Sequence, residues 1–224
     1  MTARGLFITG TDTGVGKTVA SVALLHALRA TGKTVAGMKP VASGCVETPE
    51  GWRNDDALAL LAASDGKPDY ATVNPFALPA ATAPQVAAKQ AGITLTLPPI
   101  VSAYRRLASS ADAVVVEGVG GWLAPLADDI DQTDLLRALG LTDVVLVVGL
   151  RLGCINHARL SERAIVADGF VLKGWVANAT SRETDVCEDY FRALQAAIAS
   201  PCLGRLPYAP DAGAAERASC LHGP

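Results

Sequence analysis

The sequence predicts an α/β fold in which a single parallel β-sheet carries helices on both faces. Its strand-like segments are apolar throughout instead of alternating with polar residues, which is typical of strands buried on both sides. These segments alternate along the chain with helical ones. The chain has 224 residues, 50% of them hydrophobic and 18% charged. We therefore expect one domain over residues 1–224 that buries roughly 70% of its unfolded surface.

The first half of the chain is expected to begin regularly and then to become irregular. The apolar run Gly5–Thr9 predicts the first strand, and a helix is expected from about Lys17 to Ala30. Val35–Met38 predicts a short buried strand that Lys39 and Pro40 close. The segments that follow are, in order, a loop over Val41–Arg53, a helix over Asp55–Ala63, an irregular stretch over Asp65–Pro84, and helices over Gln85–Ala91 and Ile100–Ser109.

The second half reads as a more regular alternation of strands and helices. The β-branched run Ala113–Glu117 predicts a strand that ends on an acid, and Val144–Gly149 predicts the most regular strand of the chain. The other expected elements are a helix over Gln132–Leu139, a helix over Cys154–Asp168, a strand over Leu172–Asn178, a helix over Thr184–Ala199 and a strand over Cys202–Leu206. We expect the small-residue tail, Ala209–Pro224, to be loosely held.

Composition and charge exclude several classes of function. A net charge of −3 gives no electrostatic surface for nucleic acid, and Arg105-Arg106 is the only adjacent basic pair. The five cysteines (45, 154, 187, 202 and 220) are odd in number and lack Cys-x-x-Cys spacing, which argues against a disulfide framework or a zinc site. The longest apolar run, Val144–Leu150, is too short to cross a bilayer, and no room for a signal peptide precedes the first strand. We therefore expect a soluble cytoplasmic protein that binds neither nucleic acid nor membranes.

A glycine-rich segment between the first strand and the first helix predicts a phosphate-binding loop (P-loop). Gly10–Thr18 reads Gly-Thr-Asp-Thr-Gly-Val-Gly-Lys-Thr, and strand, glycine-rich loop, Gly-Lys-Thr and helix is the context that such loops require. The glycines allow backbone N–H groups to surround phosphates, Lys17 would reach the β- and γ-phosphates, and Thr18 would ligate Mg²⁺. The first glycine lies one residue earlier than the standard spacing. A plain strand–helix turn would explain Gly14 and Gly16 but not Lys17-Thr18, so a P-loop NTPase-like sheet is predicted.

Four predicted strands end on polar residues, namely Thr9, Lys39, Glu117 and Asn178. The carboxyl ends of parallel strands share one edge of the sheet, where ligands bind, so we expect these side chains to converge there. Glu117 follows four apolar residues, as a Walker B acid does, and would hold Mg²⁺; the alternative is a surface salt bridge. Asn178 could pair with an adenine base or simply form a turn.

Two further features of this edge leave alternatives open. Asp55 and Asp56 begin a helix, so one could cap it while the other reaches the metal, and spacing does not distinguish them. Lys39 closes a buried strand near the expected γ-phosphate. Two lysines around one phosphate, Lys17 and Lys39, suggest an acceptor that is itself anionic. The alternative is that Lys39 lies in solvent at the rim of the sheet.

Together these motifs resemble the dethiobiotin synthetase family. Residues 10–19 are similar to that family's P-loop, including the displaced first glycine, and Met38–Gly44 resembles its lysine–serine loop. The other resembling segments are Thr48–Asp56, Val116–Trp122, Gly149–His157 and Gly174–Asn178, and the matches extend from Leu6 to about Tyr208. The resemblance implies a homodimeric, Mg²⁺-dependent enzyme that converts 7,8-diaminopelargonate, CO₂ and ATP to dethiobiotin, ADP and phosphate through a carbamate.

The resemblance also implies roles for individual residues. The reacting carbamate would be surrounded by Thr13, Lys17, Lys39 and Ser43, and the metal would be bound by Thr18, Asp56 and Glu117, which resolves the choice between the two aspartates. The phosphate-side contacts of the nucleotide would be Gly14, Val15, Gly16, Lys17, Thr18, Val19, Asp56, Glu117, Gly118, Val119 and Gly120. Its adenine would contact Asn178, Pro207, Tyr208 and Ala209. The substrate would contact Ser43 and, through its carboxylate at a homodimer interface, Gly153, Cys154, Ile155, Asn156 and Tyr190.

The chain departs from the family pattern at two positions. Gly14 occupies a position where some relatives carry an acid, and Val119 replaces a small residue. The rival interpretation from another class is a switch ATPase of the same P-loop branch. Such proteins usually carry a lysine at the position of Asp12, and those that cycle on membranes end in a basic amphipathic helix, which Ala214–Pro224 does not resemble. A related ATP-dependent amidotransferase domain is a further alternative, although no glutaminase portion follows.

Overall fold

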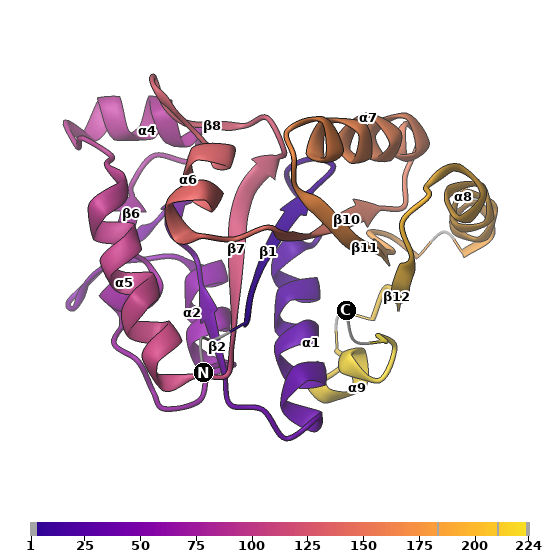
Figure 1. Ribbon diagram of the computed structural model, residues 1–224, viewed down its shortest axis with the longest axis horizontal. Helices are drawn as coiled ribbons and strands as arrows, with labels where there is room; N and C mark the ends of the chain where they lie inside the picture. Colours follow the sequence, from indigo (N-terminus) through magenta and orange to yellow (C-terminus); the bar gives the residue numbers. More distant parts are fainter. Residues whose placement is uncertain (1–3, 183, 210, 223–224) are drawn as a thin grey trace.

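The computed structural model describes residues 4–182, 184–209 and 211–222. Within these residues one sheet of six parallel strands forms the centre of the molecule, in the order β12-β11-β10-β1-β7-β2 (Figure 1). Its strands are β1 (Arg4–Gly10), β2 (Val35–Met38), β7 (Ala113–Gly121), β10 (Asp143–Gly149), β11 (Val171–Asn178) and β12 (Cys202–Leu206). The first strand therefore lies inside the sheet, between β7 and β10, and carries the loop after it to the middle of one edge.

Helices cover both faces of this sheet, as expected. Two separate apolar cores result, one between the sheet and the helices α1 and α2, the other between the sheet and α5, α6 and α7. The helices are α1 (Lys17–Ala30), α2 (Asp55–Ala62), α3 (Tyr70–Val73), α4 (Pro84–Ala91), α5 (Leu97–Ser110), α6 (Gln132–Leu139), α7 (Cys154–Ala167), α8 (Thr184–Ala197) and α9 (Ala214–Ala218). The predicted fold class is confirmed, and the predicted bounds of α1, β2, α6 and β12 agree with the structure.

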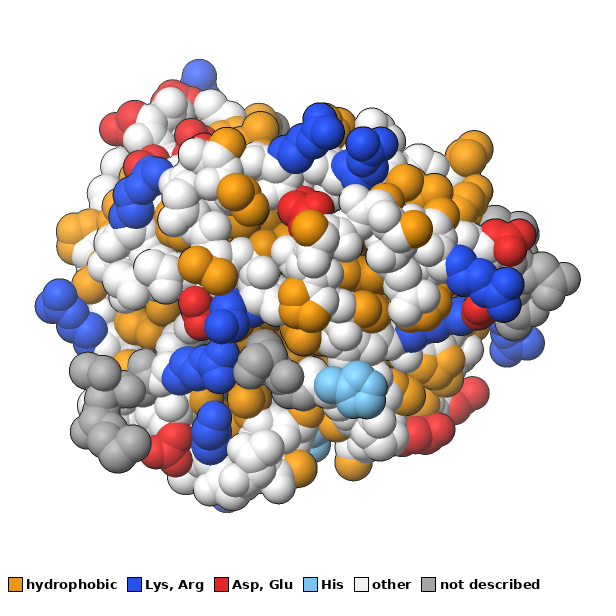
Figure 2. Space-filling view, turned by 45° about the vertical axis from the view of Figure 1, so that its right-hand side comes forward, with side chains coloured by type: hydrophobic (Ala, Val, Ile, Leu, Met, Phe, Trp, Pro, Cys, Tyr) orange, Lys and Arg blue, Asp and Glu red, His pale blue; other side chains and the backbone are white. Residues whose placement is uncertain are grey.

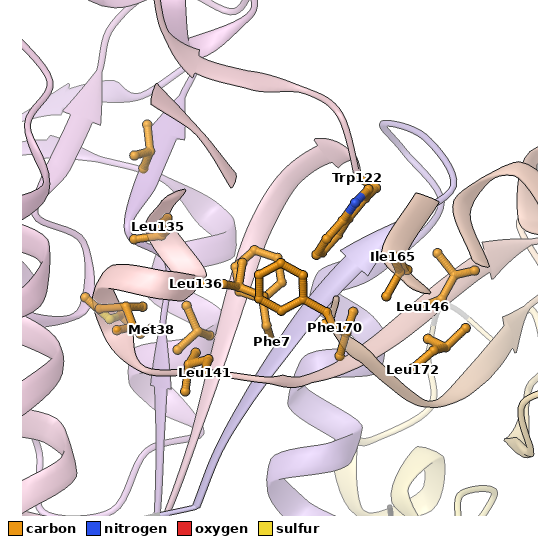
Figure 3. Packing of buried hydrophobic residues seen from close by; sticks show 14 of the residues in the cluster. Phe7, Met38, Trp122, Leu135, Leu136, Leu141, Leu146, Ile165, Phe170 and Leu172 are labelled. Carbon is orange, nitrogen blue, oxygen red and sulfur yellow. The ribbon is translucent and has the colours of Figure 1, made fainter. Parts of the chain in front are cut away.

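An aromatic cluster supports the segment that follows β7. Phe7 of β1 packs edge-on against Trp122, with ring centroids 6.4 Å apart, and Trp122 packs edge-on against Phe170 at 5.3 Å (Figure 3). The indole N–H of Trp122 donates a 2.7 Å hydrogen bond to Asp168, so its polar atom is satisfied. Fully burying a side chain such as Phe7 contributes about 2 kcal/mol. The backbone at the end of β7 is thus anchored from beneath.

The predicted loop over Val41–Arg53 is wrong, because these residues form three short strands. β3 (Val41–Ser43) pairs in parallel with β6 (Phe76–Leu78), and β4 (Val46–Thr48) forms a hairpin with β5 (Gly51–Arg53). The stretch Asp65–Pro84, expected to be irregular, contains α3 and β6. Each of β3 and β6 is only three residues long and is stabilised by a partner more than thirty residues away, so local composition does not reveal it. A further small hairpin pairs β8 (Pro125–Ala127) with β9 (Ile130–Asp131).

The C-terminal segment that we expected to be loosely held contains α9, which lies beside α1 (Figure 1). Within this segment Leu221 is buried against the core on that face and forms a β-bridge with Gly204 of β12. Residues 210, 223 and 224 of the tail, like residues 1–3 ahead of the first strand, lie outside the described residues.

The face shown in Figure 2 presents basic, acidic and apolar side chains interspersed, without a continuous basic area. That distribution agrees with the low net charge of the chain. Among the described residues, no helix is both long enough and apolar enough to traverse a lipid bilayer.

The side chain of Asp65, shortly after α2, connects α1 to the start of β2 by hydrogen bonds. Asp65 accepts hydrogen bonds from the backbone N–H of Val35 (2.9 Å) and from Nε of Arg29 (3.0 Å). These two donors, in that order, hold the pKa of Asp65 below its ordinary value of 3.8. Because the carboxylate is partly exposed, we expect Asp65→Asn to lower the free energy of unfolding by only about 1 kcal/mol at pH 7.

The same pKa sets the sign of the pH dependence. A lowered pKa in the folded state stabilises the protein above the ordinary value, and that stabilisation disappears as the pH falls through the lowered pKa. Urea unfolding of the wild type and Asp65→Asn should therefore differ at pH 7 and converge towards pH 2. Asp129→Asn, which changes an exposed carboxylate, is the matched control and should not differ from the wild type. A difference for Asp65→Asn that is the same at both pH values would contradict this account.

Candidate active site

The predicted P-loop connects β1 to α1 at the middle of the carboxyl edge of the sheet. Gly14 and Gly16 have φ angles of 72° and 86°, in the left-handed region that favours glycine. A Cβ on Gly16 would lie 2.1 Å from Nδ2 of Asn178, so a larger residue would be strained there and would displace Asn178. No side chain caps the N-terminus of α1, which leaves the first N–H groups of the helix available. The loop therefore has the backbone geometry of an anion site.

Lys17 is held across the mouth of this loop. Its Nζ donates hydrogen bonds of 2.9 Å to the backbone carbonyls of both Asp12 and Gly120, and only 8% of the residue is exposed. Burial, and after it the charge of Lys39, lower the pKa of Lys17 to about 8. A bound anion would place a negative charge beside this ammonium and so favour its charged form. This suits a residue that binds phosphate.

Lys39 and Glu117 form a buried ion pair between neighbouring strands. Met38, the last residue of β2, pairs with Val116 of β7, and this register places Lys39 beside Glu117. Lys39 Nζ lies 2.6 Å from Oε1 of Glu117 and 3.2 Å from Oδ2 of Asp56. Lys39 is 4% exposed and Glu117 is 0% exposed. The interpretation of Lys39 as a solvated rim lysine is therefore wrong.

The charges of this cluster support one another. Burial opposes the charged form of Lys39, but Glu117 and Asp56 outweigh it and raise the pKa of the ammonium above its ordinary value. Burial likewise opposes the charged form of Asp56, yet Lys39, and after it the neighbouring Thr18 hydroxyl, keep the pKa of that carboxyl below its ordinary value. A buried ion pair contributes little net stability once its desolvation is counted. Its placement beside the P-loop therefore indicates a function.

The oxygen atoms around Glu117 fit a magnesium ion. The hydroxyl of Thr18 donates a 2.9 Å hydrogen bond to Oε1 of Glu117, and Oε2 of Glu117 is buried without a partner among the described residues. Hydroxyl and carboxylate oxygens are the ligands that Mg²⁺ prefers. No group of three or more His, Cys, Asp or Glu side chains in the described part of the chain is arranged to hold a metal. A metal here would thus depend on two carboxylates, a hydroxyl and non-protein oxygens, as is usual when Mg²⁺ binds with phosphates.

Asn54, and not Asp55, caps α2. The side chain of Asn54 accepts hydrogen bonds from the backbone N–H groups of Asp56 (3.1 Å) and Ala57 (3.3 Å). Asp55 is exposed, whereas Asp56 turns towards Lys39. The ambiguity left by spacing is thus resolved in favour of Asp56 as the residue of the site. A polar residue directly before the Asp-Asp pair was the signal for the cap that our sequence reasoning missed.

The strand that carries Glu117 does not end on it, contrary to expectation. β7 continues to Gly121, which pairs with Gly10 at the start of the P-loop. Gln132, fully buried on α6, fastens this extension: its Oε1 accepts a hydrogen bond from Val119 N (3.0 Å) and its Nε2 donates one to Gly121 O (2.6 Å). Gln132 is eleven and thirteen residues from the two residues that it holds. The sequence around Glu117 alone therefore did not predict that the strand continues.

These elements enclose a cavity of about 720 Å³. Its lining unites most of the predicted phosphate, metal and acceptor residues, namely Thr13, Gly14, Gly16, Lys17, Thr18, Val19, Lys39, Ser43, Asp56, Glu117, Val119 and Gly120. The lining also includes residues that sequence reasoning did not select, namely Ala42, Asn54, Ala81–Pro84, Ala124 and Pro125. Two predicted contacts, Val15 and Gly118, do not line it; Val15 is buried, and Gly118 packs against Phe7 and Gln132.

The predicted base-binding residues lie next to a second cavity. Asn178 ends β11, and its Nδ2 donates a 2.9 Å hydrogen bond to the carbonyl of Val15 in the P-loop. Pro207, Tyr208 and Ala209 line a separate hollow of about 740 Å³ that also borders Ala179, the residue after Asn178. Asn178 therefore connects the P-loop, which it contacts by a hydrogen bond, to this hollow, which its neighbour Ala179 lines.

The residues predicted to hold a substrate carboxylate lie apart from the P-loop cavity of the same chain. Gly153 precedes α7 with a φ of 92°, and no side chain caps the N-terminus of that helix. Cys154 is buried, whereas Asn156 is exposed. Tyr190 lies on α8, packed against the larger core. Arg151, just ahead of Gly153, forms an ion pair with Asp12 of the P-loop and so links the two regions.

Comparisons with known proteins agree with this geometry. A family model described as an AAA domain matches residues 4–216. The chain is 58% identical over 218 residues to the ATP-dependent dethiobiotin synthetase BioD of Xanthomonas oryzae pv. oryzae (strain PXO99A), covering 97% of each chain. It is 61% identical over 208 residues to the enzyme of the same name from Xanthomonas campestris pv. campestris (strain 8004), covering 93% of this chain and 92% of that one.

Among solved structures, the septum site-determining protein MinD of Pyrococcus horikoshii OT3, in complex with Mg-ADP, matches with a TM-score of 0.56. The match covers 93% of this chain and 82% of that one, at 14% sequence identity. At that identity the likeness shows a shared fold of the P-loop NTPase kind and nothing more.

The buried ion pair generates a stability prediction. Lys39→Met removes one charge and leaves Glu117 without its ammonium partner, which should lower the free energy of unfolding by about 3 kcal/mol. The double variant Lys39→Met/Glu117→Gln removes both charges and should recover most of that loss. Denaturant unfolding at pH 7 in metal-free buffer measures both. A double variant no more stable than Lys39→Met would contradict the pairing.

Proposed function

The chain belongs to the ATP-dependent dethiobiotin synthetase family, and from this premise we propose that it closes a cyclic urea on 7,8-diaminopelargonate. The membership makes it an ATP-dependent ligase of biotin synthesis. The proposed reaction consumes the diamine, CO₂ and ATP and yields dethiobiotin, ADP and phosphate. The observation that carries the proposal is the gathering of Lys17, Lys39 and an oxygen-rich metal site in one cavity.

The proposed reaction has three steps. One amine of the substrate attacks CO₂, forms an N–C bond and loses a proton, which gives a carbamate anion. A carbamate oxygen then attacks the γ-phosphorus of ATP, and the bond to the bridging oxygen breaks so that ADP leaves with its electron pair. The second amine attacks the carbonyl carbon of the resulting carbamic–phosphoric anhydride, expels phosphate, loses a proton and closes the ring.

The second step brings two anions together, and the arrangement of charges suits that difficulty. The γ-phosphate and the carbamate repel each other, so cations on both sides would lower the barrier. Lys17, in the P-loop, would neutralise the phosphate. Lys39 enters the same cavity from β2, with Thr13 and Ser43 also in the lining, and these three residues would surround the carbamate. The proposed role of Lys39, which is paired with two carboxylates, is to orient the acceptor and not to anchor the nucleotide.

Thr18, Asp56 and Glu117 are the residues proposed to hold Mg²⁺. Bound there, the ion would neutralise charge on the β- and γ-phosphate oxygens. The chain itself would contribute the ligands and their orientation. The unpartnered Oε2 of Glu117 supports this assignment, and Thr18 already contacts the opposite oxygen of the same carboxylate.

The nucleotide would extend from the P-loop past Asn178, with its base between Asn178 and Pro207–Ala209. The second hollow beside those residues supports this placement. The substrate carboxylate would bind at the N-terminus of α7, at Gly153–Asn156, with Tyr190 contributing a hydroxyl across a homodimer interface. A helix start with free N–H groups suits a carboxylate. As an enzyme of biosynthesis, the homodimer would act in the cytoplasm.

A labelled-bicarbonate assay tests this proposal. With ATP, Mg²⁺ and the diamine, the purified protein should convert ¹⁴C-bicarbonate into an acid-stable product and release one ADP for each molecule formed. Lys17→Ala should reduce turnover by roughly 100- to 1000-fold, because one lost contact to transition-state charge costs about 3–4 kcal/mol. Lys89→Ala, an exposed lysine on α4, is the matched control and should retain full activity.

Two outcomes of this assay would contradict the proposal. ATP hydrolysis without incorporation of label would indicate a switch ATPase of the same fold. Incorporation that persists in Lys17→Ala would remove the P-loop from the mechanism.

A further inference from the structure

A chain of hydrogen bonds connects the backbone of Lys39 to the residue that caps α2. Nδ2 of Asn74 donates to the carbonyl of Lys39 at 2.6 Å, and Oδ1 of Asn74 accepts from the hydroxyl of Tyr70 at 3.0 Å. The same hydroxyl accepts from the backbone N–H of Asn54 at 2.8 Å. The phenol of Tyr70 is thus both donor and acceptor in this chain, and Asn74 is only 3% exposed.

This chain closes into a ring at the active site. From Asn54, the side-chain oxygen accepts the N–H of Asp56 at 3.1 Å. The carboxylate of Asp56 lies 3.2 Å from the ammonium of Lys39, the residue at which the chain of bonds began. The two charged side chains are therefore held together directly, and their backbones are held together through Tyr70 and Asn74.

The segment that carries the two connecting residues is built to present them together. Tyr70 and Asn74 are four positions apart (i and i+4), so the single turn of α3 places both side chains on one face. Asp69 caps that turn by accepting the N–H and the hydroxyl of Thr72, each at 2.8 Å. The carbonyl of Val73 accepts a hydrogen bond from the backbone N–H of Lys39 at 2.9 Å, and Asn74 donates one to the carbonyl of Lys39. Both backbone polar groups of Lys39 are therefore bonded to α3 or to the residue after it.

We infer that Tyr70 and Asn74 are positioning residues for the phosphoryl-transfer step, which act by fixing Lys39 against Asp56. This inference rests on the proposed function and deepens it, because it names the residues that set the geometry of the acceptor side of the cavity. Removing the Tyr70 hydroxyl leaves the N–H of Asn54 and Oδ1 of Asn74 without their partner. Both ends of the ring can then shift, and a partly buried network of hydrogen bonds loses its rigidity.

Tyr70→Phe tests the inference with a minimal change. The ring remains, together with the Arg53 guanidinium stacked over it at 4.3 Å, and only the hydroxyl is lost. Misplacing a reacting group by about 1 Å can cost roughly 100-fold in rate, so we expect kcat to fall about tenfold for this partial release. The KM for ATP should change less than about twofold, because the P-loop contacts the nucleotide independently. This separation of kcat from KM is the readout that a purely structural role would not produce.

Tyr104→Phe is the matched control. It removes the hydroxyl of a buried tyrosine on α5 that does not line the cavity, and it should leave kcat and KM at wild-type values. Melting temperatures of both variants are recorded, and kinetics are measured well below them. A wild-type kcat in Tyr70→Phe, or an equal fall in Tyr104→Phe, would overturn the inference.

A double-mutant cycle gives a second, independent arm. Asn74→Ala should lower kcat more than Tyr70→Phe does, since it also frees the carbonyl of Lys39. Because both residues act through one chain of bonds, adding Tyr70→Phe to Asn74→Ala should lower kcat little further. Fully multiplicative losses would show that the two residues act separately and would overturn the inference. Failure of the proposed function is distinguishable, because the wild type itself would then form no labelled product.

Discussion

The ion pair between Lys39 and Glu117 is the constraint on which the site depends. A carboxylate with no exposed surface is unfavourable unless a cation lies against it, and the parallel pairing of β2 with β7 supplies that cation from the neighbouring strand. Asp56 reaches the same ammonium from the start of α2. Three elements that are far apart in the sequence thus meet at one charge cluster, and the P-loop lies directly beside it.

The surrounding structure serves to keep this cluster at a fixed place. Aromatic packing of Phe7, Trp122 and Phe170 lies under the end of β7, and Gln132 of α6 holds the backbone after Glu117. That same backbone supplies the carbonyl of Gly120, which accepts from Lys17. The position of Lys17 therefore depends on the strand that carries Glu117. Apolar packing below the sheet therefore fixes the positions of the charged side chains at its carboxyl edge.

The features that could be predicted from the sequence are those set by local pattern and by the geometry of parallel sheets. The P-loop is contained in nine consecutive residues, and the meeting of Lys39 with Glu117, with Asn178 further along the same edge, follows because parallel strands share a carboxyl edge. Most of the features that were missed depend on distant partners. β3 is stabilised by β6, the extension of β7 by Gln132, and Lys39 by Asn74. Two missed features were local, namely the hairpin of β4 and β5 and the choice of Asn54 as the cap of α2.

The central claim is that Lys39 orients the carbamate acceptor, while Lys17 binds the phosphates of the nucleotide. Lys39→Gln tests it most directly, since the amide can still donate a hydrogen bond to Glu117 but carries no charge. Turnover and the ATP dissociation constant, the latter measured without the diamine, are compared with those of the wild type. The account predicts that kcat falls roughly 100-fold or more while the dissociation constant changes less than about threefold. A dissociation constant that rises as steeply as kcat falls would make Lys39 a nucleotide ligand and contradict the account.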